Sequence, residues 1–415
     1  MNYRVWYSTE SFADFIIANT EIRNKGVIEK NKMYESDANN AKNFHTMPDH
    51  IKKILYLDAP DIIVEIDSEP IFSIEVSTEA GTGHNVFQRF ARLAASVENN
   101  VPSFYIYPEA VIIHRKNGTP TGWDKINPLI FKALEHVMSI YQIPSLFFYF
   151  PSDYKTHDTN PALSPHLRDK GLIYDSNRNY AGSPNGNDSE MGKMFSCINE
   201  IISINERHGV VKGRGKLLAN RTIIDRKDFM QQEYANKSGN LKMSPLSATH
   251  EIPTEYILNY LKQFETTSYK VGELLKSRDK SILYQVDSKT FRSDPYAGCI
   301  AAIDYLKCRE GKTFEERRYN LITIWGKLEI DHPNKTITIS TKKKSTINSL
   351  VNSVKNSEAR NILKKNYSQL KNYEIPRYYM QMRYGSTFSK PKEVRIFAYF
   401  ADAILFPDGA LWRDA

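Results

Sequence analysis

Hydrophobic and polar residues alternate over two short stretches, 61–66 and 71–77, which predicts two β-strands joined by the polar turn at 67–70. Successive side chains of a strand point to opposite faces, so one face of each predicted strand is apolar. The opposite face carries acidic residues, among them Asp61 on the first strand and Glu75 on the second. An antiparallel hairpin would therefore bring these two carboxylates together near its open end.

After this hairpin, the pattern alternates between helix and strand. Apolar residues recur at helical spacing over 84–99 and 127–141, and continuous apolar runs over 101–108 and 143–151 predict buried strands. Strands followed by alternating helices and strands predict an α/β fold with a mixed sheet core flanked by helices. We expect this first domain to comprise residues 1–150.

The composition changes after residue 150. Residues 151–190 are rich in Pro, Ser, Asn, Asp and Gly, which predicts a linker or a long surface loop. Residues 191–415 are expected to form a second, basic α+β domain for DNA specificity or dimerisation. The helices and strands that we expect in and just before this domain are 189–206, 255–264, 294–309, 320–330, 335–341 and 394–400.

Composition indicates a globular protein with an excess of positive charge. The 415 residues are 41% hydrophobic and carry a formal net charge of +8, which suits a polyanionic partner such as nucleic acid. No apolar run approaches the roughly 18 residues that a membrane helix needs, and the N-terminus lacks a signal-peptide pattern, so we expect a cytoplasmic protein without a membrane partner. The three cysteines have no CxxC or zinc-type spacing, which argues against a disulfide framework.

Two carboxylates held close on one face are suited to binding a divalent cation such as Mg²⁺. Carboxylate oxygens are the hard ligands that Mg²⁺ prefers, and without a counter-ion the two like charges would repel each other. We therefore expect Asp61 and Glu75 to be metal ligands. The alternative is structural: Asp61 caps a turn, and Glu65 and Asp67 are solvated.

These residues resemble the active-site motif of the PD-(D/E)xK nuclease superfamily, to which many type II restriction endonucleases belong. The matching features are Pro60-Asp61, a spacing of fourteen residues, Glu75-Val76-Ser77 and an amphipathic helix, within roughly residues 50–150. The resemblance implies a restriction-endonuclease-like sheet core in which Asp61 and Glu75 bind Mg²⁺.

The third catalytic position departs from the superfamily pattern. The resemblance implies a Lys two residues after Glu75, but this chain has Ser77 there. Activation of the attacking water would then depend more strongly on the bound metal ion. Glu79 is a further catalytic candidate if the strand continues beyond Ser77.

The helix that follows resembles the superfamily helix that packs behind the active site. His84, Gln88 and Arg92 lie on one stripe of this helix because they recur every four residues. We expect Gln88 to support the catalytic cluster. We expect Arg92 to support the carboxylates or to contact DNA phosphates, and its neighbour Arg89 to contact DNA.

Two other segments concentrate positive charge and are candidate DNA contacts. The first includes Lys212, Arg214 and Lys216, separated by glycines whose backbone amides could approach a phosphate. The second joins Lys342, Lys343 and Lys344 to a predicted basic helix that could dock on the DNA backbone. Each segment could equally be an ordinary solvated surface.

The function expected from the resemblance is that of a type II restriction endonuclease, which hydrolyses phosphodiester bonds of double-stranded DNA with Mg²⁺. Such an enzyme is expected to act as a homodimer, with a cognate DNA methyltransferase encoded separately. A structure-specific or repair nuclease is the enzymatic alternative. A non-catalytic DNA-binding protein on a decayed nuclease scaffold is the alternative of another class, and Ser77 in place of Lys keeps it open.

Overall fold

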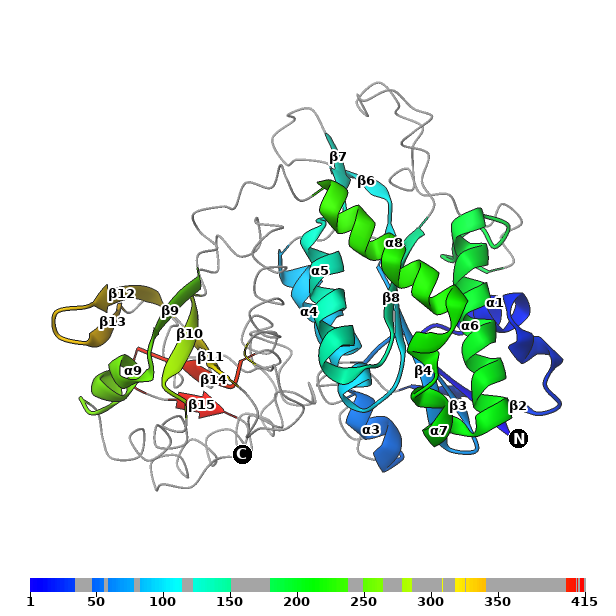
Figure 1. The fold of residues 1–415 in the computed structure, drawn as a ribbon, viewed down its shortest axis with the longest axis horizontal. Helices are drawn as coiled ribbons and strands as arrows, with labels where there is room; N and C mark the ends of the chain where they lie inside the picture. Colours follow the sequence, from blue (N-terminus) through cyan, green and yellow to red (C-terminus); the bar gives the residue numbers. More distant parts are fainter. Residues whose placement is uncertain are drawn as a thin grey trace, which may run out of the picture.

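The described residues of the computed structural model form a six-stranded sheet in the N-terminal part of the chain, a five-stranded sheet in the C-terminal part and two small two-stranded sheets (Figure 1). The expected strand at 394–400 and, apart from Cys308, the expected helix at 294–309 lie outside the described residues. The described residues are 1–33, 47–55, 59–77, 83–113, 122–150, 180–237, 249–263, 278–285, 308, 318–324, 326–340, 401–407, 409 and 411–413.

The N-terminal sheet has the strand order β2-β1-β3-β4-β5-β8. Strands β1, β3 and β4 are antiparallel to one another in turn, whereas β2 is parallel to β1, and β4, β5 and β8 run parallel. This mixed sheet with flanking helices confirms the predicted α/β class. The strands are β1 (Tyr3–Tyr7), β2 (Ile28–Lys32), β3 (Ile62–Ile66), β4 (Glu69–Val76), β5 (Ser103–Pro108) and β8 (Ser145–Phe150).

The expected hairpin is formed by β3 and β4. Its two turn residues, Asp67 and Ser68, both have positive φ angles, 49° and 70°, as a two-residue turn of the type favoured in hairpins requires. The Asp67 carboxylate accepts a hydrogen bond of 2.8 Å from the backbone amide of Asn2, which ties the turn to the start of β1. The predicted hairpin is thus confirmed.

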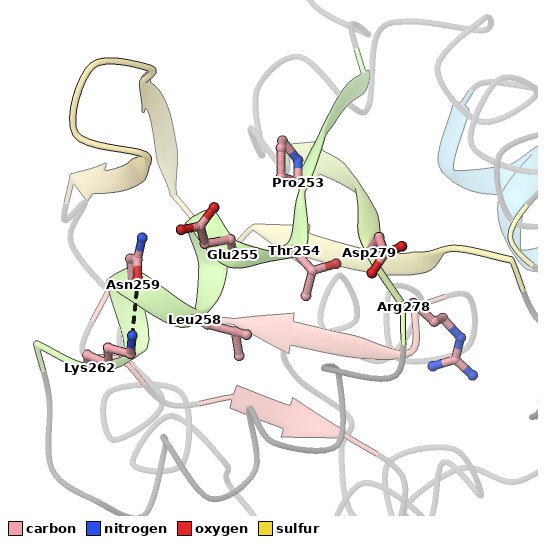
Figure 2. A pocket seen from close by; sticks show the side chains of 8 residues that line it. All are labelled: Pro253, Thr254, Glu255, Leu258, Asn259, Lys262, Arg278 and Asp279. Atoms are coloured by element: carbon pink, nitrogen blue, oxygen red, sulfur yellow. Dashed lines mark hydrogen bonds between the residues drawn. The ribbon is translucent and has the colours of Figure 1, made fainter.

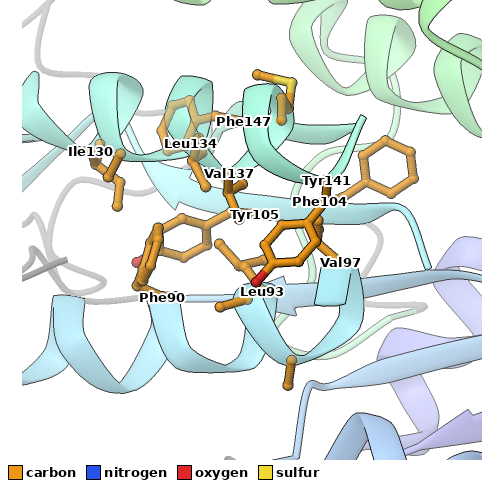
Figure 3. Close-up of a cluster of buried hydrophobic side chains, with 14 of the residues drawn as sticks. Phe90, Leu93, Val97, Phe104, Tyr105, Ile130, Leu134, Val137, Tyr141 and Phe147 are labelled. Atoms are coloured by element: carbon orange, nitrogen blue, oxygen red, sulfur yellow. The ribbon is translucent and has the colours of Figure 1, made fainter. Parts of the chain in front are cut away.

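One face of the sheet is covered by helices α4 (Gly83–Glu98) and α5 (Leu129–Tyr141). Figure 3 shows side chains from both helices gathered around residues of β5 and β8. Phe131 of α5 packs edge-on against Phe147 of β8, with ring centroids 5.0 Å apart. Each fully buried Leu or Phe side chain in such a core stabilises the fold by roughly 1.5–3 kcal/mol. Residues that form this part of the core include Phe90, Leu93, Val97, Tyr105, Leu134 and Val137.

Helices from later in the chain cover the opposite face. They are α6 (Ser189–His208) and α7 (Val210–Arg214). Helix α8 (Arg221–Lys237), which follows the 3₁₀ turn η3 (Leu217–Ala219), lies along the edge strand β8 and contacts α5 as well as α6. The hydroxyl of Tyr3 in β1 donates a hydrogen bond of 2.6 Å to Glu206 of α6. Arg226 of α8 stacks on Phe148 and Phe229, donates to the Phe147 carbonyl and pairs with Glu190 of α6.

The position of these helices corrects the expected domain boundary. The composition of 151–190 predicts that the second domain begins at residue 191, but 189–237 pack on β4 and β8 of the first sheet. These helices return to the first sheet because β8 is apolar on both faces and α6 and α8 pack against it. The N-terminal unit therefore extends to Lys237.

Three short helical segments complete the N-terminal unit. Helix α1 (Glu10–Asn19) buries Phe12, Phe15 and Ile16, and is followed by the 3₁₀ turn η1 (Glu21–Asn24). Helix α3 (Asp49–Leu55) packs against α4 and β4. A small two-stranded sheet is formed by β6 (Ala110–Ile113) and β7 (Gly122–Lys125).

The C-terminal sheet has the order β15-β14-β11-β10-β9, with β10, β11 and β14 parallel. Its strands are β9 (Thr249–Pro253), β10 (Lys280–Gln285), β11 (Asn320–Ile324), β14 (Ala403–Leu405) and β15 (Leu411–Arg413). Helix α9 (Thr254–Leu261) packs against β9 and against a separate hairpin of β12 (Lys327–Asp331) and β13 (Thr336–Ser340).

The single strand expected at 320–330 is two strands. The extended conformation is interrupted at Gly326, whose φ is +155°. Residues with a Cβ rarely adopt this backbone conformation. A Cβ at Gly326 would also lie 2.7 Å from Ile339 Cγ2. Gly326 therefore separates β11 from the β12–β13 hairpin.

Among the helices that the structure describes, none combines the length and apolar character that crossing a membrane requires.

Candidate functional site

The structure brings Asp61 and Glu75 together at the open end of the β3–β4 hairpin. Asp61 precedes β3, and its backbone amide donates a hydrogen bond of 2.9 Å to the Ile74 carbonyl of β4. The next residue of β4 is Glu75, and its pKa is raised in part by the negative charge of Asp61. The two acidic groups thus interact electrostatically, as the alternation of the sequence predicts.

Three hydrogen bonds fix the position of Asp61. Its Oδ1 accepts a hydrogen bond of 2.9 Å from the Ser8 hydroxyl at the end of β1. Its Oδ2 accepts one of 2.8 Å from the backbone amide of Val76, the residue after Glu75. The backbone amide of Ser8 donates to the Asp61 carbonyl at 2.9 Å. Asp61 is therefore held between β1 and β4 in one orientation.

Glu75 is fully buried and ion-paired on one side only. Its Oε1 lies 2.8 Å from Arg89 Nη1 and 2.7 Å from Arg92 Nη1, both on α4. Among the described residues, no hydrogen-bond donor reaches Oε2. The pKa of Glu75 is raised to about 8, chiefly by burial; Arg92 and Arg89 oppose the shift and the charge of Asp61 adds to it.

The two arginines that the sequence offers as DNA contacts are thus engaged inside the protein. Arg92 was one of two candidates for supporting the carboxylates, and its guanidinium group does contact Glu75. Arg89 makes the same contact one turn earlier on α4. In this arrangement the charges of the two arginines balance those of Asp61 and Glu75.

The remaining catalytic candidates are only partly described. Ser77 is buried directly after β4, and its backbone amide donates a hydrogen bond of 2.9 Å to the Ile106 carbonyl of β5. Gln88 lies in α4, but its side chain is outside the described part of the structure, as is all of Glu79. Ser77 therefore continues the β4–β5 pairing, with its side chain in the position where the superfamily pattern has Lys.

The basic segment of α7 lies at the opposite end of the hairpin. Arg214 donates hydrogen bonds of 3.3 Å to Glu69 Oε2 and 3.2 Å to the Pro70 carbonyl, at the start of β4. Five residues of strand separate Pro70 from Glu75, which corresponds to about 17 Å. Arg214 thus supports the hairpin turn rather than facing solvent alone.

The other predicted basic contacts differ in exposure. Lys212 and Lys216 are exposed on either side of Arg214 and remain candidates for contact with an anionic surface. Lys342, Lys343 and Lys344 lie outside the described residues.

A second buried carboxylate, Glu65 of β3, was not expected. The alternation of the sequence offers Glu65 as a solvated acid, but its side chain is enclosed and paired on both oxygens. Arg4 Nη1 of β1 lies 2.6 Å from Oε1, and His50 Nε2 of α3 lies 2.7 Å from Oε2. The sequence gives no direct signal for this pairing, because Arg4 and His50 are distant from Glu65 in the chain.

The donor set at the hairpin fits a hard cation in one respect and opposes it in another. Two carboxylates converge, and the unpaired buried oxygen of Glu75 can accept a ligand bond. Against this, Arg89 and Arg92 place two positive charges on the same carboxylate. In the part of the chain that the structure describes, no cluster of three or more His, Cys, Asp or Glu side chains with metal-binding geometry occurs.

The C-terminal part contains an open pocket of about 410 Å³ at the start of α9 (Figure 2). Its charged residues are of both signs, Glu255 and Asp279 beside Lys262 and Arg278. Arg278 Nη1 donates a hydrogen bond of 3.0 Å to the buried Asn320 side chain. The mixed charges of the pocket favour neither a cation nor an anion, and neither Asp61 nor Glu75 lines it.

Comparisons with known proteins identify no relative. No family model matches the chain, and no curated protein or solved structure is significantly similar to it.

Proposed function

We propose that this protein is a Mg²⁺-dependent endonuclease that hydrolyses phosphodiester bonds of double-stranded DNA, with Asp61 and Glu75 as the metal ligands. The observation that carries the proposal is the convergence of these carboxylates at the open end of one hairpin, where Glu75 keeps a buried oxygen without a donor among the described residues. The succession of β3, a turn, β4 and α4 along the chain also supports the proposal, because the resemblance rests on a strand-turn-strand-helix order.

Each residue of the site has a defined part in this proposal. Ser8 and the Val76 amide orient Asp61, and the two α4 arginines bind Glu75 and oppose the rise in its pKa. A bound Mg²⁺ would polarise the scissile phosphate and lower the pKa of a coordinated water. Ser77 cannot replace Lys as a positive group, so no residue of the motif itself supplies the charge that Lys would provide.

The finer assignment follows from the resemblance. We propose a type II restriction endonuclease with a fixed recognition sequence, acting as a homodimer beside a separately encoded methyltransferase. A structure-specific or repair nuclease would instead cut junctions, flaps or mismatches, and a panel of such substrates separates the two.

The test is cleavage of a large, fully sequenced, unmethylated DNA by the purified protein in Mg²⁺. Glu75→Ala and Asp61→Asn remove one ligand each, a chelator removes the metal, and Glu329→Gln serves as a control at an exposed acidic residue. We expect discrete fragments from the wild type and the control only. Intact DNA at every concentration of wild-type protein would refute the nuclease proposal.

A non-catalytic DNA-binding scaffold is the second candidate, and a specific observation favours it. Arg89 and Arg92 neutralise Glu75 without any metal, as expected where a former metal site has been replaced by an internal ion pair. This candidate predicts salt-dependent DNA binding that Mg²⁺ and Glu75→Ala leave unchanged. The nuclease proposal predicts that Ca²⁺ strengthens DNA binding by the wild type but not by Glu75→Ala.

A further inference from the structure

When Glu75 is ionised, the charges of the described residues that surround it sum to zero in the free protein. Asp61 and Glu75 contribute two negative charges, and Arg89 and Arg92 contribute two positive charges. A divalent cation added to this group would leave two uncompensated positive charges in a site where Glu75 is fully enclosed. Such an excess is costly because water screens it poorly there. The cation therefore needs either additional negative charge or the departure of an arginine.

The two arginines are placed so that they can leave. They are three residues apart on α4 and so project from the same side of the helix. The Arg89 side chain is 26% exposed and that of Arg92 12% exposed, so both reach solvent although they bind a buried carboxylate. Guanidinium groups bind phosphate oxygens through paired, charge-assisted hydrogen bonds. A DNA phosphate near α4 would thus compete with Glu75 for both side chains.

We propose that Arg89 and Arg92 act as a latch on the carboxylate pair, holding Glu75 in the free protein and transferring to DNA phosphates when DNA binds. Glu75 is then released to the divalent cation. Because coupling between two binding equilibria is reciprocal, DNA strengthens cation binding and the cation strengthens DNA binding by the same factor. The inference rests on the proposed nuclease site and adds its regulation: the metal centre is completed only on DNA.

Arg89→Gln is the variant that separates the latch from a purely structural ion pair. It removes the more exposed arginine and leaves Arg92 on Glu75, so the buried carboxylate keeps a counter-ion. Calorimetric titration with Ca²⁺ in the absence of DNA, at a pH above the Glu75 pKa, measures the affinity of the cation site. We expect Ca²⁺ to bind Arg89→Gln at least about fivefold more tightly than the wild type.

Two controls accompany this measurement. Arg89→Lys keeps a positive charge at the site and should bind Ca²⁺ like the wild type. Arg221→Gln removes the same charge from a side chain that is 95% exposed on α8, so it tests whether net charge alone changes the affinity. Thermal unfolding of each variant confirms that it is folded under the titration conditions.

The second measurement uses a short random-sequence DNA duplex in Ca²⁺ over a series of salt concentrations. If Arg89 moves to a phosphate, Arg89→Gln lowers the slope of log affinity against log salt by about one, whereas Arg89→Lys does not. Equal Ca²⁺ affinity of the wild type and Arg89→Gln without DNA, together with an unchanged salt slope, would overturn the latch and leave the nuclease proposal standing. Absence of Ca²⁺ binding by every variant, with and without DNA, would overturn both.

Discussion

The hydroxyl of Ser8, at the end of β1, donates a hydrogen bond of 2.9 Å to Oδ1 of Asp61. The two residues are 53 positions apart in the sequence, and the bond links the start of the chain to the proposed metal site. Ser8 acts on the site only through Asp61, which makes it a positioning residue.

Ser8→Ala should therefore lower the metal affinity of the site more strongly than it lowers the free energy of unfolding. Loss of an oriented outer partner of a ligand typically costs about tenfold or more in metal affinity, whereas one lost hydrogen bond costs about 1 kcal/mol of stability. Ca²⁺ titration of the protein with bound DNA and denaturant unfolding measure the two effects. Ser11→Ala, which removes an exposed hydroxyl on α1, is the matched control. Equal Ca²⁺ affinities of the two variants would exclude a positioning role for Ser8.

A second prediction concerns the buried Glu65. Arg4→Met leaves this enclosed carboxylate with His50 as its remaining partner, so we expect a loss of about 2 to 3 kcal/mol in the free energy of unfolding. Arg221→Met, at a pair whose atoms are 3.9 Å apart and exposed, should cost less than about 0.5 kcal/mol. Urea unfolding of both variants measures these two losses. Equal losses of unfolding free energy would mean that the pairing of Glu65 with Arg4 does not stabilise the fold.

The pair Tyr3–Glu206 predicts a dependence of stability on pH. Partial burial of Glu206 acts to raise its pKa, but hydrogen bonds from Lys25 and Tyr3 outweigh this and lower the pKa overall. A carboxyl group with a lowered folded-state pKa contributes stability above its unfolded pKa, near 4.3, and loses that contribution as the pH falls through the folded value.

Glu206→Gln should therefore be less stable than the wild type at neutral pH, by about 1 kcal/mol, and the difference should shrink as the solution is acidified below pH 4 or so. Urea unfolding at a series of pH values measures this difference. A gap between the two proteins that stays constant or widens on acidification would show that Glu206 is not ionised in its pair.

Cys197 of α6 should be chemically inert in the folded protein. Burial raises the pKa of its thiol to about 12, with Arg226 opposing the shift and Glu190 and Glu200 adding to it. Compared with the ordinary value of 9.0, its thiolate fraction falls about a thousandfold at mildly alkaline pH. Mass spectrometry after iodoacetamide treatment should find Cys197 unmodified in native protein and fully modified in urea. Rapid native labelling would indicate frequent opening of α6.

The central part of the N-terminal sheet is predictable from the sequence because its signals are local. The alternation over 61–66 and 71–77 and the helical stripe after it correspond to β3, β4 and α4. The same alternation brings Asp61 to Glu75. Strand β1 also has a local signal, since the apolar residues Tyr3 and Val5 are buried while Arg4 between them is not.

The rest depends on contacts that no local pattern encodes. The alternation places Glu65 on the acidic face of its strand, but it does not show whether that face is exposed to solvent or covered. The face is covered because β1 and α3 pack there and supply Arg4 and His50. The α4 arginines have the same spacing whether they contact DNA or Glu75. The Pro/Asn-rich stretch before α6 has the composition of a linker, yet the helices after it return to the first sheet because β8 has an uncovered apolar face.

The bond between Tyr3 and Glu206 also has a consequence for synthesis on the ribosome. Glu206 follows Tyr3 by 203 residues. At translation rates of about 5–20 residues per second, Tyr3 therefore waits roughly 10 to 40 s before Glu206 is synthesised. Contacts of such long sequence separation also slow folding itself. The partners that position Asp61, Ser8 and the backbone of Ile74 and Val76, are by contrast all synthesised more than a hundred residues before Glu206.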